Sequence, residues 1–509
     1  MNKHTKLFRD PVHGNIEIPV DYCHKFIDTA LFQRLRFVEQ SSMRMLFPSA
    51  RHDRFVHSLG VYSIARRVFS SLETKIRESF QGNDNQITRF KETFLSAALL
   101  HDCAHSPFSH TGESVAKHYC GSEIEQKLIA TIGSESFRND FYGNNKSNYA
   151  THELASAYVA CKVFGTEFDE YNIDKEQFAR MITGIRNKDT HTTESKTYNC
   201  LISLINGFVV DVDRLDYLQR DTWATGICNA SVDLESLIGG IDVDLNSGEI
   251  RIKHTALPSI VNAISARDYI YQWILPNHIV VYANLIMERA IHNLISSMAS
   301  EEMSAAKVGE MLFSPDRLLQ DGQVNINGET IHMPTDGDLL YLMKKYIPCD
   351  ENFLAYSIRQ QKHISLWKTH AEFVNLFMSI LHDKQLNSFK EASLWEVYHA
   401  KLHEFAKSHP YCLCSEPRPV KTIRHEMCSL NANIEDSYAH KILQSDKLDL
   451  NYLFGSIQQD ADFHFNAFIT ASAIRDNAVK AENVIKDLQQ LLVDTIDEYD
   501  SLKDPHILS

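Results

Sequence analysis

Three histidines and an aspartate fall within ten residues in HDCAHSPFSH, residues 101–110, directly after the apolar run FLSAALL. That run predicts that His101 and Asp102 are buried at a helix end, where two polar groups need a compensating partner. His105 follows His101 by four residues, on the same helical face if the helix continues, and Pro107 then ends the helix. A single histidine could simply favour the helix C-terminus. Three with an aspartate favour a bound metal ion.

Two further segments could supply ligands to the same ion. RFVHSLGVYSIARR places His57 at the start of an amphipathic helix, three residues after Arg54. In DVDRLDYLQRD, Asp213, Asp216 and Tyr217 stand at positions i, i+3 and i+4, and the preceding apolar FVV indicates that at least one carboxylate is buried. A solvated surface helix would explain either segment alone. Two imidazoles and two carboxylates would suit iron, manganese, zinc or, more weakly, magnesium, and could activate water and neutralise a phosphoryl group. The predicted ligands are His57, His101, Asp102 and Asp213.

Helical elements must position these residues, because apolar residues recur at spacings of three and four along most of the chain. The predicted fold class is mainly α. One exception is 242–253, DVDLNSGEIRIK, where two alternating runs around Asn-Ser-Gly predict a β-hairpin. The polar stretches 133–148 and 186–197 are expected to be exposed loops. Turn signals after residue 305 predict a core over 1–305 and a mixed, mainly helical region over 306–509 with an oligomerisation or regulatory role.

Composition narrows the classes of function. The chain has 509 residues, of which 44% are hydrophobic and 23% charged, so it can bury a large core. It has no apolar run of about 18 residues and no apolar leader, so we expect a cytoplasmic protein without a membrane span. A net charge of −15 disfavours strong nucleic-acid binding. The ten cysteines include no CxxC, and Cys412 and Cys414 are expected to be reduced thiols in a loop.

The motifs DPVHG, FQRLR, RHDRFVHSLGV, HDCAHSPFSH and DVDRLDY resemble the HD-domain superfamily of metal-dependent phosphohydrolases, in particular its dNTP triphosphohydrolase (dGTPase-like) branch. The resemblance spans roughly residues 6–300. It implies a multi-helix HD core that uses the four metal ligands named above. It also implies hydrolysis of a dNTP to a deoxynucleoside and inorganic triphosphate. Depletion of dNTPs during phage infection and control of the dNTP pool are both compatible with that reaction.

The resemblance also assigns residues to the reaction. Glu113 replaces an aspartate of the mammalian member of this branch, which should preserve proton delivery. Ile274 stands where a phosphate-binding arginine is expected, and this departure keeps other phosphoesters open. The implied catalytic residues are His105, His110, Glu113 and His152. The implied substrate contacts are Arg54, Arg214 and Tyr217 for the triphosphate, Gln40 and Asp221 for the sugar 3′-hydroxyl, and His278 and Tyr282 around the sugar.

Members of this branch are activated by nucleotides bound between subunits, so the resemblance implies a homotetramer and an activating nucleotide, GTP or a dNTP. Asp28 and Arg36 are among the positions that would bind this nucleotide. The alternative is that Asp28 only caps the next helix and Arg36 only makes a surface pair. We expect His13 only to serve as a turn residue before Gly14. The matching regulatory positions are Lys6, Leu7, Asp28, Gln33 and Arg36.

Two other functions remain open at this point. The first is an HD-type nucleotidase or phosphodiesterase that acts on another nucleotide, since metal-activated water attacks any phosphorus placed over such a site. The second is a nucleotide-sensing effector subunit, for example in phage defence, whose C-terminal half binds a partner. Gln40, Asp221 and Tyr282 favour the dNTP triphosphohydrolase over the first alternative.

Overall fold

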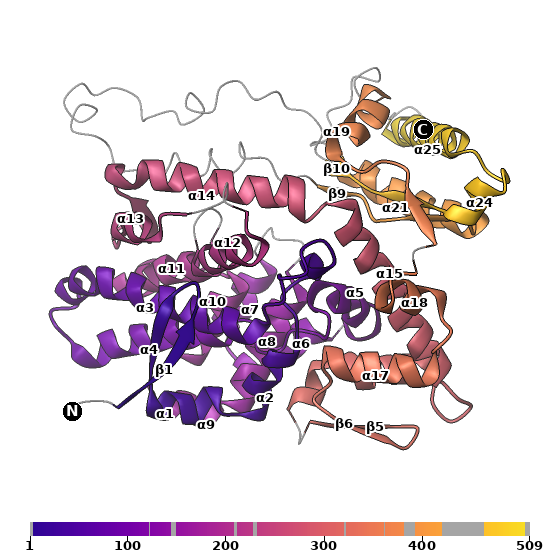
Figure 1. Ribbon diagram of the computed structural model, residues 1–509. Helices are drawn as coiled ribbons and strands as arrows, with labels where there is room; N and C mark the ends of the chain where they lie inside the picture. Colours follow the sequence, from indigo (N-terminus) through magenta and orange to yellow (C-terminus); the bar gives the residue numbers. More distant parts are fainter. Residues whose placement is uncertain are drawn as a thin grey trace, which may run out of the picture. The chain divides into compact units, whose positions relative to one another are not determined.

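The computed structural model describes residues 4–121, 123–143, 149–207, 211–227, 232–319, 322–360, 362–380, 392–419 and 463–503. These residues are mainly helical, with antiparallel sheets of two or three strands (Figure 1). The predicted fold class is therefore confirmed. Two compact units are formed. The described part of the first lies within Met1–Arg267 and Glu288–Pro348, and that of the second within Asp268–Met287, Cys349–His425 and Phe454–Ser509.

The elements from the N-terminus to α17 include most of the predicted HD core. In chain order they are β1 (Thr5–Asp10), β2 (Gly14–Pro19), α1 (Val20–Tyr22), α2 (Ala30–Gln33), α3 (Arg54–Ser79), α4 (Asp84–Leu100), α5 (Ser109–Cys120), α6 (Ile124–Ile132), α7 (Glu135–Tyr142), α8 (Thr151–Val163), α9 (Gly165–Glu170), α10 (Lys175–Thr183), α11 (Thr193–Ile205), α12 (Val212–Thr225), α13 (Leu234–Gly240), β3 (Ile241–Asp244), β4 (Glu249–Ile252), α14 (Leu257–Tyr269), α15 (His278–Met298), α16 (Ala305–Phe313), β5 (Gln323–Ile326), β6 (Glu329–His332) and α17 (Asp336–Tyr346).

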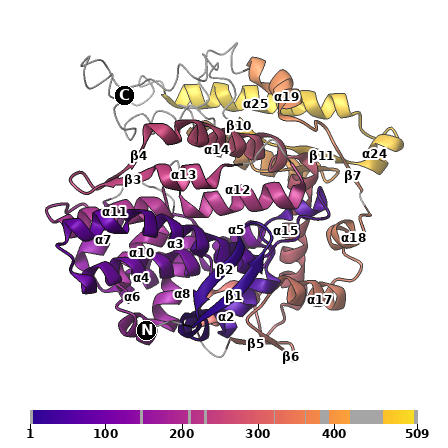
Figure 2. The same cartoon turned by 60° about the vertical axis from the view of Figure 1, so that its left-hand side comes forward.

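Helix α3 is the centre of the first unit. It packs against both α4 and α12, and α10 packs against α4 and α8 (Figures 1 and 2). The side chain of Asp53 accepts a hydrogen bond from the backbone N–H of Val56 and so caps the start of α3. The last seven residues of α4, 94–100, are all buried, as the apolar run predicts. The ends of α3, α4 and α12 are thereby held together.

Small strands flank these helices. β1 and β2 form an antiparallel hairpin that closes with Asp10 opposite Gly14, whose φ of 71° suits glycine. The hairpin predicted over 242–253 is confirmed by the pairing of β3 with β4. Among the described residues, no helix is both long and apolar enough to cross a membrane.

Several local predictions were wrong. Residues 135–142 form α7 because Ser134 caps the helix and Phe137 and Phe141 bury one face. α11 begins at Thr193, inside the second predicted loop, where the Thr192 side chain accepts the N–H of Ser195. Residues 144–148 of the first predicted loop lie outside the described residues.

The division expected at residue 305 differs from the two compact units. Residue 305 starts α16, which packs against α5 within the first unit. Gly309 permits this contact, because a Cβ at that position would lie 2.5 Å from the ring of Tyr119. Residues 268–287 belong instead to the second unit.

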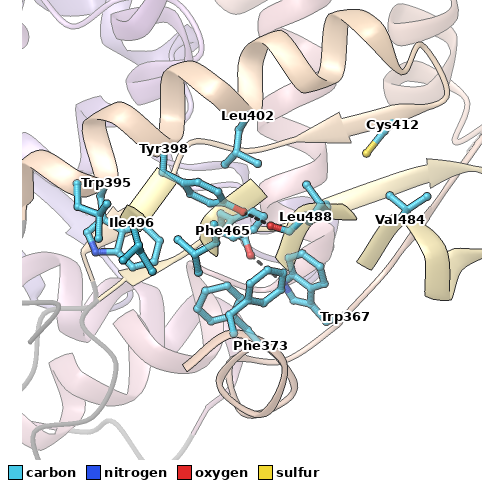
Figure 3. Packing of buried hydrophobic residues seen from close by; sticks show 14 of the residues in the cluster. Trp367, Phe373, Trp395, Tyr398, Leu402, Cys412, Phe465, Val484, Leu488 and Ile496 are labelled. Carbon is cyan, nitrogen blue, oxygen red and sulfur yellow. Dashed lines mark hydrogen bonds between the residues drawn. The ribbon is translucent and has the colours of Figure 1, made fainter. Parts of the chain in front are cut away.

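The second unit has its own hydrophobic core, which Figure 3 shows from close by. Trp367 donates a hydrogen bond from Nε1 to the carbonyl of Phe465 (2.7 Å), and Tyr398 donates one from its hydroxyl to the carbonyl of Leu488 (3.0 Å). Its main elements are α18 (Glu351–Ser357), β7 (His363–Ser365), α19 (His370–Phe373), α21 (Ala392–Ser408), β8 (Cys412–Cys414), β9 (Arg418–Pro419), β10 (Phe463–His464), β11 (Ala467–Thr470), α24 (Ala471–Arg475) and α25 (Ala481–Lys503).

Strand β11 pairs with β7 on one side and β8 on the other, so Cys412 and Cys414 lie on an edge strand. The prediction that these cysteines lie in a loop was therefore wrong. Cys412 is buried in the core because alternate residues of β8 face it.

Candidate functional site

Three predicted metal ligands converge from three helices. His57 lies in the first turn of α3, His101 follows the last residue of α4, and Asp213 lies in the first turn of α12. Their ligand atoms all lie within 4.8 Å of one another. The Oδ1 atom of Asp213 is 2.9 Å from His57 Nε2 and 3.7 Å from His101 Nε2. Side chains more than 40 residues apart in the sequence thus meet at one point.

Both imidazoles are oriented for coordination. His57 Nδ1 lies 2.7 Å from Asp216 Oδ2, and His101 Nδ1 lies 2.9 Å from the carbonyl oxygen of Ala98. Because these oxygens accept hydrogen bonds, each Nδ1 carries a proton and each Nε2 faces the cluster, where it could bind a metal ion. Within the described chain, both Nε2 atoms are buried and make no hydrogen bond. The donor set fits a divalent metal ion.

Asp102 lies against the same two imidazoles. Its Oδ2 atom is 3.7 Å from His57 Nε2 and 3.5 Å from His101 Nε2. It also accepts a hydrogen bond from Arg54. Burial alone would raise the pKa of Asp102, but Arg54 and the neighbouring histidines hold it well below its ordinary value. The carboxylate is therefore ionised and available to a metal ion.

Arg54 links the candidate metal ligand Asp102 to Ser109, the first residue of α5. Besides Asp102, it donates to Ser109 Oγ (3.1 Å) and to the carbonyl of Gln40 (3.2 Å). Only 3% of Arg54 is exposed. The arginine predicted to contact triphosphate is thus held in a buried network that fixes Asp102.

A second cluster comprises His105, His110, Glu113 and His152, whose ligand atoms also lie within 4.8 Å of one another. α4 ends at Leu100, so His105 does not continue the helical face of His101. Glu113 Oε2 lies 3.1 Å from His110 Nδ1 and 3.0 Å from His152 Nδ1. His105 is fully buried, and neither of its ring nitrogens has a hydrogen-bond partner among the described residues.

The members of this second cluster differ in the direction in which their pKa values are shifted. Burial would lower the pKa of His152, but the Glu113 carboxylate raises it to about 9. Burial would raise the pKa of Glu113, but His152 and His110 lower it. Burial, reinforced by Arg54, lowers the pKa of His105 well below its ordinary value. A neutral imidazole, a protonated imidazole and a carboxylate therefore stand together, which suits proton transfer.

The loop before α5 is held by residues that the sequence analysis missed. Phe108 and Ser109 have φ values of 59° and 50°, a left-handed conformation that is costly without glycine. Asp336 accepts the backbone N–H of Phe108 (2.6 Å) with one oxygen and that of Glu39 (3.0 Å) with the other. Arg34 donates to the carbonyl of His105 (2.8 Å). Because Asp336 follows the loop by more than 220 residues, no local pattern could have identified it.

Four predicted substrate residues also lie in the first unit. Asp221 is 2.8 Å from His52 Nε2, and the buried Gln40 donates its backbone N–H to the carbonyl of His52. Arg214 lies 3.4 Å from Asp211. Tyr217 follows Asp213 by one helical turn on α12. The structure thus places Gln40 and Asp221 around one histidine, and Arg214 and Tyr217 on the helix of the ligand Asp213.

The remaining predicted substrate residues belong to the second unit. The Tyr282 hydroxyl lies 3.0 Å from His363 Nδ1, and its ring packs against Phe468. His278 is the first residue of α15. Ile274 is buried, with 5% exposure, as an apolar residue should be. The roles of His278 and Tyr282 around a sugar stay predictions.

The predicted regulatory residues form small surface pairs. Lys6 Nζ lies 3.3 Å from Asp28 Oδ1, and Arg36 donates to Gln33 Oε1 (2.8 Å) while its guanidinium stacks over Phe55. Leu7 is 58% exposed. The alternative that Asp28 caps the next helix is wrong.

Thr29 supplies that cap instead, because its side chain accepts the N–H of Phe32. Asp28 is thereby left to pair with Lys6. A nucleotide at these residues stays a prediction.

Residues 54–218, which carry the candidate metal ligands, match the family model of the HD domain. The chain therefore contains an HD domain. It is 42% identical over 234 residues to the deoxynucleoside triphosphate triphosphohydrolase SAMHD1 of Danio rerio, covering 44% of this chain and 34% of that protein. It is 31% identical over 226 residues to the SAMHD1 homolog of Dictyostelium discoideum, covering 44% and 37%.

An uncharacterized Bacillus subtilis protein, YwfO, is 28% identical over 290 residues, covering 56% of this chain and 55% of that protein. The chain thus spans between a third and about half of the length of these relatives. A hypothetical protein from Aquifex aeolicus shares the fold, with a TM-score of 0.57, 20% identity, and coverage of 96% of this chain and 100% of that one.

Proposed function

We propose that the protein is a metal-dependent dNTP triphosphohydrolase that converts a dNTP and water to a deoxynucleoside and inorganic triphosphate. The observation that carries the proposal is the presence of two clusters, one of three convergent metal ligands and one of histidines around Glu113. Arg54 donates hydrogen bonds both to Asp102, beside the first cluster, and to Ser109, the residue before His110 of the second. The similarity to SAMHD1 proteins, which are named for this reaction, supports the same substrate class.

His57, His101, Asp102 and Asp213 would hold the divalent ion. When bound, that ion supplies activation of water and neutralisation of phosphoryl charge. His110, paired with Glu113, gives a proton to the departing 5′-oxygen. The buried neutral His105 and the protonated His152 orient the water and the phosphates. In this proposal Arg54, Arg214 and Tyr217 contact the triphosphate, and Gln40 and Asp221 hold the 3′-hydroxyl. A contact of His278 and Tyr282 with the sugar stays an expectation from the family resemblance.

A second candidate is an HD nucleotidase or phosphodiesterase that acts on a different nucleotide. The buried Ile274 favours it, because an apolar side chain at this position cannot neutralise a phosphate. Both candidates use the same metal centre, so only the product distinguishes them.

The test is product analysis with purified protein and Mn²⁺, supplying each dNTP singly and then all four together. Deoxynucleoside and triphosphate, formed mainly in the mixture, would support both the reaction and its activation by a nucleotide. Pyrophosphate or single phosphates would favour the second candidate. The matched control is Asp102→Asn, which removes a ligand charge and should abolish turnover. If Asp102→Asn abolished hydrolysis but left the biological effect of the protein intact, the alternative of a nucleotide-sensing effector subunit would be favoured.

The proposal includes a homotetramer assembled with GTP or a dNTP at Lys6, Leu7, Asp28, Gln33 and Arg36. Light scattering with and without nucleotide tests this part. A monomer under both conditions would remove the assembly and the activation while leaving the reaction itself open.

A further inference from the structure

A buried hydrogen-bond network joins the β1–β2 turn to the metal ligand His57. His13 Nε2 lies 2.6 Å from Asp216 Oδ1, and His57 Nδ1 lies 2.7 Å from Asp216 Oδ2. The side chains of His13 and Asp216 are 2% and 0% exposed. His13 is thus more than the turn residue that the sequence predicts. One buried carboxylate serves two imidazoles.

Arg220 completes the set of donors around this carboxylate. One turn after Asp216 on α12, it donates from Nε to Oδ2 and from Nη2 to Oδ1, both at 2.9 Å. A carboxylate has about four lone-pair sites, and two imidazoles and two guanidinium donors fill them. Since a carboxylate can only accept, both histidines donate to it. His57 is thereby held with its proton on Nδ1 and its Nε2 lone pair toward the metal centre.

The same arginine ties the network to the turn a second time. Arg220 Nη1 donates to Asp10 Oδ2 (2.8 Å), while Asp10 Oδ1 accepts the backbone N–H groups of Val12 (2.9 Å) and His13 (2.8 Å). The turn that carries His13 therefore has its own conformation set by Asp10. The motif DPVHG supplies both an acceptor and a donor to the network.

Gly60 of the HSLGV motif leaves space for the Asp216 and Arg220 side chains of this network. A Cβ on Gly60 would lie 1.8 Å from Asp216 Oδ1 and 2.5 Å from Arg220 Nη2. Real Cβ atoms do not approach so closely, so any larger residue at position 60 would displace the Asp216 carboxylate from its present place. Three separate motifs thus meet at Asp216.

We propose that His13 and Asp216 are positioning residues for the metal ligand His57, and that the β1–β2 turn thereby determines how tightly the centre holds its divalent ion. The inference rests on the metal-dependent function proposed above. Partners of metal-ligating histidines typically change metal affinity about 10- to 100-fold when they are replaced. An asparagine at 216 could present its NH₂ group to Nδ1 and move the imidazole proton to Nε2, which blocks coordination.

The experiment is calorimetric titration of the full chain with Mn²⁺. We expect Asp216→Asn to weaken binding about 10- to 100-fold and His13→Gln to weaken it about tenfold or less. The matched control is Asp140→Asn, which neutralises another buried carboxylate of the first unit, one paired with Arg180 at 2.9 Å. This control should bind Mn²⁺ like the wild type. A Co²⁺-loaded His13→Gln protein should also show a shifted visible absorption spectrum.

Mn²⁺ binding by folded Asp216→Asn within twofold of the wild type would overturn the proposal. If Asp216→Asn does not fold, as judged by circular dichroism, unchanged Mn²⁺ affinity and an unchanged Co²⁺ spectrum in His13→Gln would overturn it instead. Equal losses of Mn²⁺ affinity in Asp216→Asn and Asp140→Asn would mean that Asp216 contributes only to the general stability of the protein, and would overturn the proposal. A wild type that binds Mn²⁺ but releases no triphosphate from dNTPs would remove the proposed reaction and leave this inference standing.

Discussion

His105 stacks on His152 with ring centroids 4.5 Å apart and planes 19° apart, yet the two imidazoles differ in protonation. Glu113 pairs with His152 and raises its pKa to about 9, whereas burial and Arg54 keep His105 neutral. Two stacked groups whose pKa values are pushed apart are the arrangement that acid–base catalysis needs. The position of one carboxylate decides which imidazole is charged.

The first prediction concerns the dependence of the free energy of unfolding on pH. Folding raises the pKa of His152 from about 6.5 in the unfolded chain to about 9. The protonated imidazole therefore stabilises the folded state fully below about pH 6.5, and this stabilisation is lost as the pH rises through about 9. Glu113 does not change this window, because its pKa lies below its ordinary value. Urea unfolding should show His152→Gln to be less stable than the wild type by about 1–3 kcal/mol at pH 6. The difference should shrink by pH 9.5; a constant difference would contradict the assignment of charge.

The second prediction concerns metal removal and addition. Asp213 is the most exposed of the three converging ligands, at 38% of its side chain, so Asp213→Asn should fold with nearly wild-type stability. Mn²⁺ at about 100 times its dissociation constant should stabilise the wild type by about 2.7 kcal/mol and the variant much less. Thermal unfolding with EDTA and with Mn²⁺ measures both effects. Equal stabilisation of the two proteins would place the ion elsewhere.

The third prediction concerns Asp336, which joins α17 to the loop of His105. In Asp336→Asn one of the two oxygens becomes an NH₂ group, which faces the backbone N–H of either Glu39 or Phe108. We expect about 1–3 kcal/mol of lost stability. We also expect about a tenfold lower kcat with unchanged Mn²⁺ affinity, because misplacement of catalytic groups lowers the rate.

Asp338 on the same helix offers the matched control for this variant. Its side chain accepts from Thr335 in a capping box, so Asp338→Asn should cost about 1 kcal/mol or less and leave kcat unchanged. If both variants lowered kcat equally, the effect would come from α17 as a whole rather than from Asp336.

How far the sequence predicted the site depends on the range of each contact. His101 and Asp102 follow a buried run within one segment, and His57 and Asp213 begin amphipathic helices, so periodicity and residue type were sufficient to propose them. The structure brings His57, His101 and Asp213 into one cluster. By contrast, Asp336 and Arg34 act through backbone groups far along the chain, and no pattern of residue types records such contacts.

The fold shows the same limit. The mainly helical class and the hairpin of β3 and β4 follow from local periodicity and a turn, and both are confirmed. Residues 135–142 were expected to be a loop because their polar composition concealed the pair Phe137 and Phe141, which tertiary burial turns into a helix face. Residues 268–287 fall in the second unit although they precede residue 305, since unit membership depends on packing between distant segments.

The last prediction compares two glycines on helices. Alanine has the better helix propensity, by about 1 kcal/mol, so Gly→Ala should stabilise an open helical position. At Gly60 the added Cβ would displace Asp216, and at Gly309 it would displace the ring of Tyr119. Both variants should therefore lose stability by about 1–3 kcal/mol, measured by chemical unfolding.

Only Gly60→Ala should weaken Mn²⁺ binding, since only Gly60 adjoins the carboxylate that orients His57. Calorimetry on both variants separates general overpacking from a specific effect on the ligand. Unchanged Mn²⁺ affinity in Gly60→Ala would mean that His57 keeps its orientation without Asp216, whereas weaker binding in both would mean that the metal centre senses any loss of packing in the first unit.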